Sequence, residues 1–416
     1  MKVLIISPTV VDYVSVGKIT IFLYDQLKKN GHDAKLIYFG LNGKQRKYIS
    51  INKNELITKI RYKLVLMSKF EFHWHYMGEH RWRKIIKEYD PDIIQMIQPM
   101  EEYIDTRALF GAIGQSRIPC VYTMIDESAY LGNCDNAYQC RQFMESNGCE
   151  GCKGKNYKEN LIDYGGYWNT QGCVNKARLK SECYQWIDKI CFVAPEWVIE
   201  RAKQSVMLKG RKFYEVDEYV NNEDIYYPRE PDDKVLRQYG VDRSKILFLN
   251  VARYSNARKG IKYYIELARK FEADDRYQFI QIGYDGNGVG LPQNYVSLPF
   301  IKDQNITSMF YSIADLFIIT SLADTMPNVC LEALSCGTPI CGFNVSGIPY
   351  VAKGQLGVFV EPENVDELAR IVGDTKKKSS DMVQKCREYA IARYSPSVYI
   401  KKMIKIYENE KNDKEK

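Results

Sequence analysis

Residues able to bind a diphosphate occur in one short segment in the second half of the chain, Asn250–Gly260 (NVARYSNARKG). Arg253 lies just past a continuous apolar run, and Lys259 stands directly before Gly260 and a stretch with helical periodicity. Two cations at the end of a buried strand suit a departing diphosphate, because they stabilise the charge that develops on it. Either residue taken alone could equally be solvated surface charge.

A second segment, Ser321–Gly347, could bind the same anion. Its strand pattern ends before Asp324, a helix pattern begins at Asn328, and Gly337 occupies a position that commonly ends a helix. The N–H groups at a helix start bind phosphate when they adjoin the carboxyl end of a strand. Asp324 and Glu332 could then accept hydrogen bonds from hydroxyl groups on either side of that phosphate. The alternative is a solvent-facing loop followed by an ordinary amphipathic helix.

Alternating strand and helix patterns must position these segments. Continuous apolar runs are typical of parallel strands covered by helices on both faces, and they recur in both halves of the chain. Strands are predicted at residues 3–7, 34–39, 92–98, 119–125, 189–194, 246–252, 277–283, 315–320 and 339–343, and helices at 18–29, 260–271, 305–313 and 328–336. The pattern predicts an α/β protein with two doubly wound, Rossmann-like domains.

The length of 416 residues fits two to three domains of about 150 residues each. Asn221–Asp233 is polar, contains two prolines and is typical of a linker. We therefore predict an N-terminal domain at 1–227 that contains the insertion described below, a second domain at 228–394, and a C-terminal helix with a charged tail at 395–416. The longest apolar stretch has 13 residues, whereas a membrane-spanning helix needs about 20. We expect no transmembrane segment and a cytoplasmic location.

The C-terminal half resembles a known enzyme family. The sequence LEALSCGTPICGF at 331–343 and the spacing of Arg253 and Lys259 look like those of the retaining family-4 glycosyltransferases with the GT-B fold. The resemblance is strong over residues 245–372, and SLADTMPNVCLEAL is similar to a branch that acts in capsule and exopolysaccharide biosynthesis. It implies an acceptor-binding domain at 1–227 and a nucleotide-sugar-binding domain at 228–394 that face each other across a cleft, with the C-terminal helix returning to the first domain.

The same resemblance implies a role for each candidate residue. Arg253 and Lys259 would hold the donor diphosphate, Asp324 would contact the hydroxyls of the transferred sugar, and Glu332 would bind the ribose. Backbone amides from Met326 to Val329 would help to bind the phosphates. The donor-binding set is Gly17, Arg253, Lys259, Asp324, Met326, Pro327, Asn328, Val329 and Glu332, and the catalytic set is Asp126, Arg253, Lys259 and Asp324.

Two positions depart from the pattern of the family. The first acid of its Glu-x7-Glu motif is Asp324 here, and Ile125 stands where a His-Asp pair usually places histidine. Asp126, the second residue of that pair, is retained and becomes the candidate catalytic carboxylate of the first domain. Its alternative role is to form a turn at the end of a strand. In the Gly-rich loop position of the family only Gly17 is available to let backbone approach the donor.

Cysteines are concentrated in a Gly- and Asn-rich insertion at about residues 130–175. Cys134, Cys140, Cys149 and Cys152 form a C-x5-C-x8-C-x2-C pattern. Disulfides are disfavoured in the cytosol, and four thiolates could hold a structural zinc ion. Free thiols and disulfides are the alternatives.

Most of the net charge of +7 can be traced to residues 41–90. This stretch holds 12 basic and five acidic residues together with eight aromatic rings. Nothing else in the sequence resembles a nucleic-acid-binding module, so no nucleic acid is expected as a partner. Amphipathic segments of this composition could lie against an anionic membrane surface, and a solvated helical face is the alternative.

These observations predict a retaining glycosyltransferase of the hexosyltransferase type. It would move a sugar from a UDP- or GDP-sugar to a glycan acceptor, which could be lipid-linked and reached from the inner face of the membrane. The resemblance implies that the β-phosphate of the departing nucleotide takes the proton of the acceptor, so the chemistry would need no metal. A nucleotide-sugar-binding protein without activity and a sugar-nucleotide epimerase on the same fold are the alternatives.

Overall fold

A computed structural model describes residues 1–11, 15–39, 48–50, 78–99, 104–132, 134–137, 140–145, 149, 170–252, 257–284, 286 and 290–413. The described chain forms two compact units. The first lies within Met1–Asn156, Gly166–Val216 and Ile400–Lys416, and the second within Asp217–Tyr399. The division at Val216 lies 11 residues before the boundary expected at position 227.

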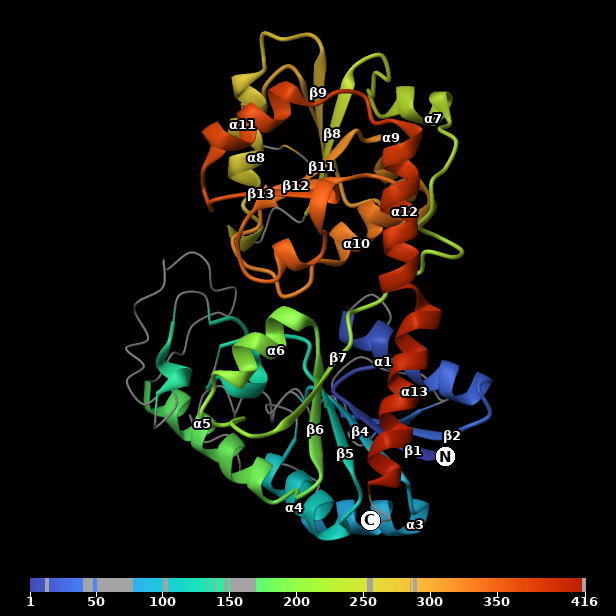
Figure 1. The fold of residues 1–416 in the computed structure, drawn as a ribbon, viewed down its shortest axis with the longest axis vertical. Coiled ribbons are helices and arrows are strands. Elements are labelled where there is room, and N and C mark those ends of the chain that lie inside the picture. The colour runs from blue at the N-terminus through green and yellow to red at the C-terminus, as the bar shows by residue number, and fades with distance from the viewer. Residues whose placement is uncertain are drawn as a thin grey trace. The chain divides into compact units, whose positions relative to one another are not determined.

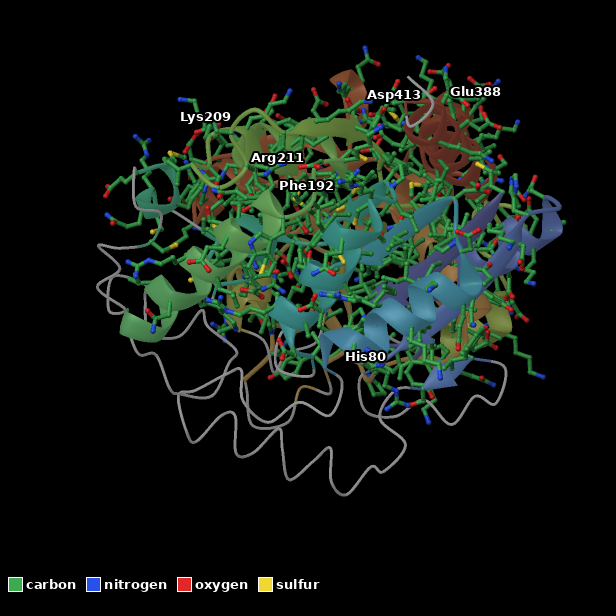
Figure 2. The ribbon with its side chains drawn as sticks, turned by 90° about the horizontal axis from the view of Figure 1, so that it is seen from below. His80, Phe192, Lys209, Arg211, Glu388 and Asp413 are labelled. Atoms are coloured by element: carbon green, nitrogen blue, oxygen red, sulfur yellow. The ribbon has the colours of Figure 1, made fainter. Side chains whose placement is uncertain are left out.

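The first unit is built on a parallel sheet of seven strands in the order β3-β2-β1-β4-β5-β6-β7. The strands are β1 (Lys2–Ser7), β2 (Asp33–Tyr38), β3 (Ile49–Ser50), β4 (Ile93–Ile97), β5 (Cys120–Thr123), β6 (Ile190–Ala194) and β7 (Lys212–Glu215). Residues on β4, β5 and β6 are buried throughout, as expected for strands covered on both faces. Phe192 on β6 lies in this interior (Figure 2).

Helices cover both faces of the first sheet. The helices are α1 (Ser15–Lys29), α3 (Glu79–Tyr89), α4 (Thr106–Ser116), α5 (Thr170–Gln185), α6 (Glu196–Lys203) and α13 (Pro396–Asn412). Side chains of α3, α4 and α5 share one core with the sheet. The C-terminal helix α13 is tied to the sheet by Tyr407, whose hydroxyl donates to Oε1 of the buried Gln95 at 2.8 Å.

The second unit repeats this design with a parallel sheet of six strands in the order β10-β9-β8-β11-β12-β13. The strands are β8 (Ile246–Val251), β9 (Tyr277–Ile282), β10 (Tyr295–Leu298), β11 (Leu316–Ile319), β12 (Ile340–Phe343) and β13 (Gly357–Val360). The helices are α7 (Asp233–Gln238), α8 (Ile261–Lys270), α9 (Gln304–Ile313), α10 (Asn328–Ser335), α11 (Val365–Asp374) and α12 (Ser380–Tyr394). Helices α8 and α11 pack on one face, and α9, α10 and α12 on the other (Figure 1).

The α/β class and the two doubly wound sheets predicted from the sequence are confirmed. Each predicted strand is present to within two residues at its ends. Four strands were not predicted, namely β3, β7, β10 and β13. Each has four residues or fewer, and none is buried along its whole length. No helix among the described residues is long and apolar enough to span a membrane.

The order of the strands determines where a ligand can bind in each sheet. In both sheets the order reverses once, between β1 and β4 in the first unit and between β8 and β11 in the second. Ligands of open α/β sheets bind beyond the carboxyl ends of the strands at such a reversal. In the second unit this point is flanked by the segments that follow β8 and β11, which carry Lys259 and Asp324.

Candidate functional site

Lys259 and Asp324 meet at the reversal point of the second sheet. The Lys259 Nζ lies 2.6 Å from Oδ2 of Asp324, and the two side chains are 26% and 14% exposed. A cation and a hydrogen-bond acceptor are therefore side by side, at an edge that solvent still reaches. This pair brings together two of the four residues assigned to catalysis from the sequence.

The segment that carries Lys259 is fixed to the segment that carries Asp324 by backbone contacts. Leu322 N donates to Arg258 O at 2.8 Å, and the guanidinium of Arg258 donates to Ala323 O at 2.9 Å. Gly260 has φ of +64°, and a Cβ there would lie 2.0 Å from Thr320 O. Only glycine permits this approach, so the sequence Lys-Gly sets the ammonium beside the loop after β11.

The start of α10 follows directly from the Asp324 loop. Gly347 N donates to Asp324 O at 2.9 Å. A Cβ on Gly347 would lie 1.7 Å from Thr325 O, so only a glycine can pack this closely against the loop. The N-cap residue, Pro327, provides no side-chain hydrogen bond to the first turn. The N–H groups of Asn328 and Val329 lie in the first turn, the part of a helix whose N–H groups have no partner within the helix.

One of the four residues expected to bind phosphate through a backbone amide, Pro327, cannot do so. Pro327 has no N–H group and cannot donate to a phosphate. Of the expected amides only those of Met326, Asn328 and Val329 can serve. Met326 is also buried, and its sulfur accepts from Glu218 N at 3.2 Å.

Glu332 lies in the second turn of α10 and is partly exposed. Its Oε2 accepts a hydrogen bond from the Tyr311 hydroxyl at 2.8 Å. The carboxylate is therefore on the same helix as the candidate phosphate site, five residues from its N-cap at Pro327. The third candidate of the region, Arg253, lies outside the described residues.

Gly17 belongs to the first unit, in the first turn of α1. A Cβ on it would lie 2.0 Å from Val11 O. The absence of a side chain thus has a structural reason, close packing of the helix on the chain that follows β1. The role that the sequence predicted for Gly17, approach to the donor, stays a prediction.

Asp126 also belongs to the first unit and caps a short 3₁₀ turn, Glu127–Tyr130, after β5. Its Oδ1 accepts from Ser128 N at 2.7 Å, and its own N–H donates to Gln98 Oε1 at 3.0 Å. Burial raises the pKa of Asp126 to about 6, above its usual value, and the charge of Asp135 adds to the rise while the bond from Ser128 opposes it. Asp126 therefore both forms the turn and carries a carboxyl group with a raised pKa, which is a common property of catalytic carboxylates.

Two buried charges hold the turn that Asp126 begins. The Lys180 ammonium donates to the carbonyls of Ser128, Leu131 and Gly132 at 2.7, 2.9 and 3.1 Å. Glu127, 1% exposed, accepts from Arg201 Nε at 3.2 Å and from Ala137 N at 2.7 Å. Removing either charge would leave buried polar groups without partners, so the position of Asp126 depends on both.

The cysteine pattern is only partly within the described chain. Cys149 is buried and Cys134 and Cys140 are partly exposed, whereas Cys152 is not described. Among the residues that are described, no group of three or more His, Cys, Asp or Glu side chains is arranged to hold a metal ion. The zinc site therefore stays a prediction, and so does the membrane surface, since residues 51–77 also lie outside the described chain.

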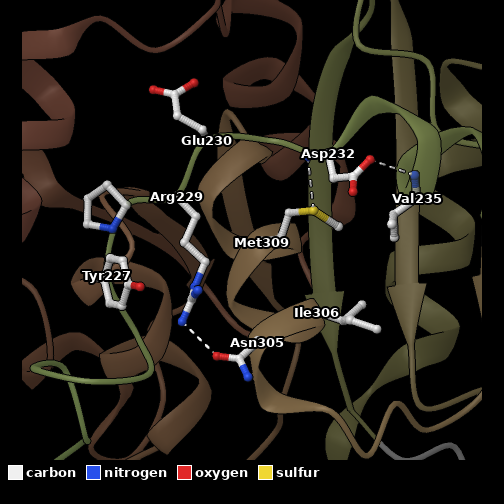
Figure 3. Close-up of a pocket in the computed structure, with 9 residues that line it drawn as sticks. Tyr227, Arg229, Glu230, Asp232, Val235, Asn305, Ile306 and Met309 are labelled. Atoms are coloured by element: carbon white, nitrogen blue, oxygen red, sulfur yellow. Dashed lines mark hydrogen bonds between the residues drawn. The ribbon is translucent and has the colours of Figure 1, made fainter.

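A separate pocket of about 420 Å³ lies on the second unit (Figure 3). It is lined by Tyr227, Pro228, Arg229, Glu230, Asp232, Val235, Asn305, Ile306 and Met309. Arg229 lies over the Tyr227 ring at 4.2 Å, and its Nη2 donates to Asn305 Oδ1 at 2.8 Å, so these groups serve mainly to hold the segment before α7 on α9.

Sequence reasoning did not identify three features of this region. Arg258 links the two loops, and Tyr311 binds Glu332 from another helix, although neither residue follows a motif spacing. Phe300, 58% exposed in the segment after β10, presents an aromatic ring at the carboxyl edge of the same sheet. The sequence could have indicated Phe300 as a candidate. An aromatic residue that lies between a strand and an N-cap aspartate, here Asp303, is a candidate surface for stacking a nucleotide base.

The second unit is similar in sequence to known glycosyltransferases. Residues 232–393 match the family described as "Glycosyl transferases group 1". Alpha-maltose-1-phosphate synthase of Mycolicibacterium smegmatis is 26% identical over 186 residues, which cover 40% of this chain and 48% of that protein. The chain spans about half the length of the curated relatives it matches.

Solved structures resemble the chain over nearly its whole length. A glycosyltransferase from Rickettsia africae has a TM-score of 0.66 at 16% identity, with 98% of both chains covered. HepE of Anabaena, solved in complex with UDP and glucose, has a TM-score of 0.63 at 14% identity and covers 98% of this chain and 100% of its own. The chain is thus related to group 1 glycosyltransferases over its second unit and has the GT-B fold.

Proposed function

We propose that this chain is a glycosyltransferase that uses a nucleotide diphosphate sugar as donor. The observation that carries the proposal is the Lys259–Asp324 pair, 2.6 Å apart at the reversal point of the second sheet and next to the N-terminus of α10. A cation, helix N–H groups and a carboxylate together fit a phosphate with a sugar attached. HepE, which has a similar fold, was solved with UDP-glucose, and this supports a UDP-sugar as the first donor to test.

The proposed roles follow from charge. Lys259 and Arg253 stabilise the negative charge of the departing diphosphate, and the amides of Asn328 and Val329 add to this. Asp324 accepts hydrogen bonds from hydroxyls of the transferred sugar, and Glu332 from those of the ribose. Asp126, the retained residue of the His-Asp pair of the family, is the candidate catalytic carboxylate of the first unit.

The reaction we propose retains the configuration of the sugar. The acceptor hydroxyl oxygen bonds to the anomeric carbon as the bond from that carbon to the β-phosphate oxygen breaks. The proton of the hydroxyl passes to the departing β-phosphate on the same face, so no divalent metal takes part. Retention is tested by the anomeric signal of the product in NMR, and metal independence by activity that persists in EDTA.

The donor assay tests the proposal as a whole. Wild type and Lys259→Ala are incubated with UDP- and GDP-hexoses, with and without glycan acceptors, and release of nucleotide diphosphate is measured. We expect turnover by wild type and a loss of about 10²-fold or more in Lys259→Ala. Lys262→Ala, an exposed lysine one turn further on, is the matched control and should keep full activity.

The assay also separates the two other classes of function. Tight nucleotide binding without turnover of any donor would contradict an enzyme and favour a nucleotide-sugar-binding protein. Conversion of the donor to its epimer without an acceptor would favour an epimerase. Neither result would alter the location of the nucleotide on the second unit.

We further propose a lipid-linked glycan acceptor of a polysaccharide pathway such as that of a capsule, with residues 41–90 in contact with an anionic membrane. The basic and aromatic composition of that segment supports the membrane contact. Flotation with liposomes should depend on anionic lipid, and no such dependence would contradict the proposal. Metal analysis tests the four-cysteine zinc site, which less than about 0.2 equivalents of zinc would refute.

A further inference from the structure

A buried tyrosine, Tyr311, binds the carboxylate of Glu332, and a second buried tyrosine, Tyr226, packs against the first. The Tyr311 hydroxyl donates to Glu332 Oε2 at 2.8 Å, and Tyr311 is fully buried in α9. The Tyr226 ring meets the Tyr311 ring edge to face, with centroids 6.1 Å apart. Burial, followed by the charge of Glu332, raises the pKa of both tyrosines well above the usual range. The Tyr311 phenol therefore remains protonated and presents an O–H donor to the carboxylate.

Each tyrosine is itself held in place. The Tyr311 carbonyl accepts from Thr338 Oγ1 at 2.6 Å, which fixes the last turn of α9 on the segment after α10. The Tyr226 carbonyl accepts from Arg387 Nη1 at 2.9 Å, and the Ile225 carbonyl accepts from Arg229 Nη2 at 2.9 Å. The segment that carries Tyr226 has no helix or strand of its own, so these two guanidinium groups determine its position.

Arg387 connects this segment to the helix that carries Glu332. Its Nη1 also donates to Ser335 O at 3.1 Å, at the last residue of α10, and its Nη2 donates to Asn222 O at 2.6 Å. A cation at this end of α10 is favoured by the helix dipole. One side chain of α12 thus fixes Tyr226 relative to α10. Tyr226 in turn packs on Tyr311, which binds Glu332.

We propose that Tyr226 and Tyr311 are positioning residues that orient the Glu332 carboxylate to accept hydrogen bonds from the ribose hydroxyls of the nucleotide. The inference rests on the proposed function, because it requires a nucleotide at α10. A glutamate that is partly exposed would otherwise adopt several rotamers, and a ligand would lose affinity in ordering it. The Tyr311 phenol, supported by the Tyr226 ring, orders the Glu332 side chain in advance, so the nucleotide gains the full hydrogen bond.

The test compares nucleotides that differ only in the ribose. Isothermal titration of the full chain measures the affinity of UDP, 2′-deoxy-UDP and 3′-deoxy-UDP, with the GDP series in parallel, for wild type, Tyr311→Phe and Tyr226→Phe. Wild type should prefer the ribonucleotide by roughly tenfold or more over at least one deoxy form, as a hydrogen bond to a charged group predicts. Tyr311→Phe should reduce that preference several-fold by weakening the ribonucleotide alone, and Glu332→Gln should bring it close to one. Tyr226→Phe keeps the ring that packs on Tyr311 and should reduce the preference less than Tyr311→Phe.

Tyr264→Phe is the matched control, since the Tyr264 hydroxyl is also buried but donates to the carbonyls of Phe248 and Ile280. It should lower the unfolding temperature without changing the preference for ribose. A purely structural role of Tyr226 and Tyr311 would weaken ribo and deoxy forms equally, and this would overturn the inference. So would a wild type that binds both forms equally well, although the proposed function would then stand. A wild type that binds neither UDP nor GDP would overturn both.

Discussion

The Lys259–Asp324 ion pair joins two groups to which we assign different parts of one ligand. Lys259 would bind the diphosphate and Asp324 would bind the sugar, yet the Lys259 Nζ lies only 2.6 Å from the Asp324 Oδ2. A ligand with both parts can satisfy both charges, whereas a nucleotide without sugar competes with Asp324 for the ammonium. The pair therefore favours the complete donor over the nucleotide diphosphate alone.

Replacing Asp324 by alanine should reverse this preference. We expect Asp324→Ala to bind UDP as well as wild type or more tightly, because Lys259 loses its internal partner. The additional affinity of the UDP-sugar over UDP should disappear. Isothermal titration with both ligands measures this, with Asp275→Ala, an exposed aspartate of the same unit, as control. Equal weakening of UDP and UDP-sugar would count against the assignment.

Asp126 should link stability to pH. Burial raises its pKa to about 6, so the folded protein binds this proton more tightly than the unfolded chain. The stabilisation by that proton is complete below about pH 4, the unfolded value, and is lost as the pH rises through about 6. Asp126→Asn is neutral at every pH and should therefore unfold at a higher temperature than wild type at pH 7.5, with a difference that shrinks toward pH 4.5.

The same variant should lose activity if the carboxylate is catalytic. We expect donor turnover at pH 7.5 to fall by about 10²-fold in Asp126→Asn. Asp105→Asn, which changes an N-cap residue of α4 in the same chemical way, serves as control for both measurements. A variant that is more stable but fully active would leave Asp126 only its role in the turn.

The turn into α8 places Lys259 and can be tested through its glycine. Gly260 and Gly354 have almost the same backbone angle, φ of +64° and +63°, but only Gly260 has a neighbour, Thr320 O, where a Cβ would be. Gly354→Ala should cost roughly 1–2 kcal/mol for the left-handed backbone alone. Gly260→Ala should cost clearly more in urea unfolding and should also reduce donor turnover. Equal costs for the two variants would mean that the contact with Thr320 does not matter.

The elements themselves were largely predictable, and the reasons are physical. Strands buried on both faces, such as β6 and β8, leave continuous apolar runs that are too short for a typical buried helix. The strand β13, at the edge of its sheet, lacks this signal because three of its four residues are at least partly exposed. The segment 221–233 looked like a linker from its composition, and the structure groups it with the second unit, where Arg229 holds it on α9.

The candidate site was predictable only where a motif orders its residues along the chain. Lys259 and Asp324 were both identified, but their contact joins positions 65 residues apart and depends on the strand order. The partners of Glu332 come from α9 and from an irregular segment, so no spacing in the sequence could reveal them. The candidate ligand-binding residues could thus be predicted from the sequence, whereas the residues that orient them could be identified only from the structure.

The division into two compact units predicts how the whole chain responds to a nucleotide. Each unit has its own sheet and its own hydrophobic core, and Lys259, Asp324 and Glu332 all belong to the second. Calorimetry should show two transitions, of which UDP or GDP raises only one. At 100 times the dissociation constant the gain is about 2.7 kcal/mol. A nucleotide that shifts both transitions equally would contradict binding to the second unit alone.

The central claim, that the nucleotide of the donor binds at the reversal point of the second sheet, is tested most directly by hydrogen exchange. The full chain is measured by mass spectrometry with and without the nucleotide diphosphate that binds best. The account predicts slower exchange in residues 257–263 and 320–335, and unchanged exchange in 227–235 and 304–313, which line the separate pocket. Protection confined to the first unit, or to that pocket, would contradict it.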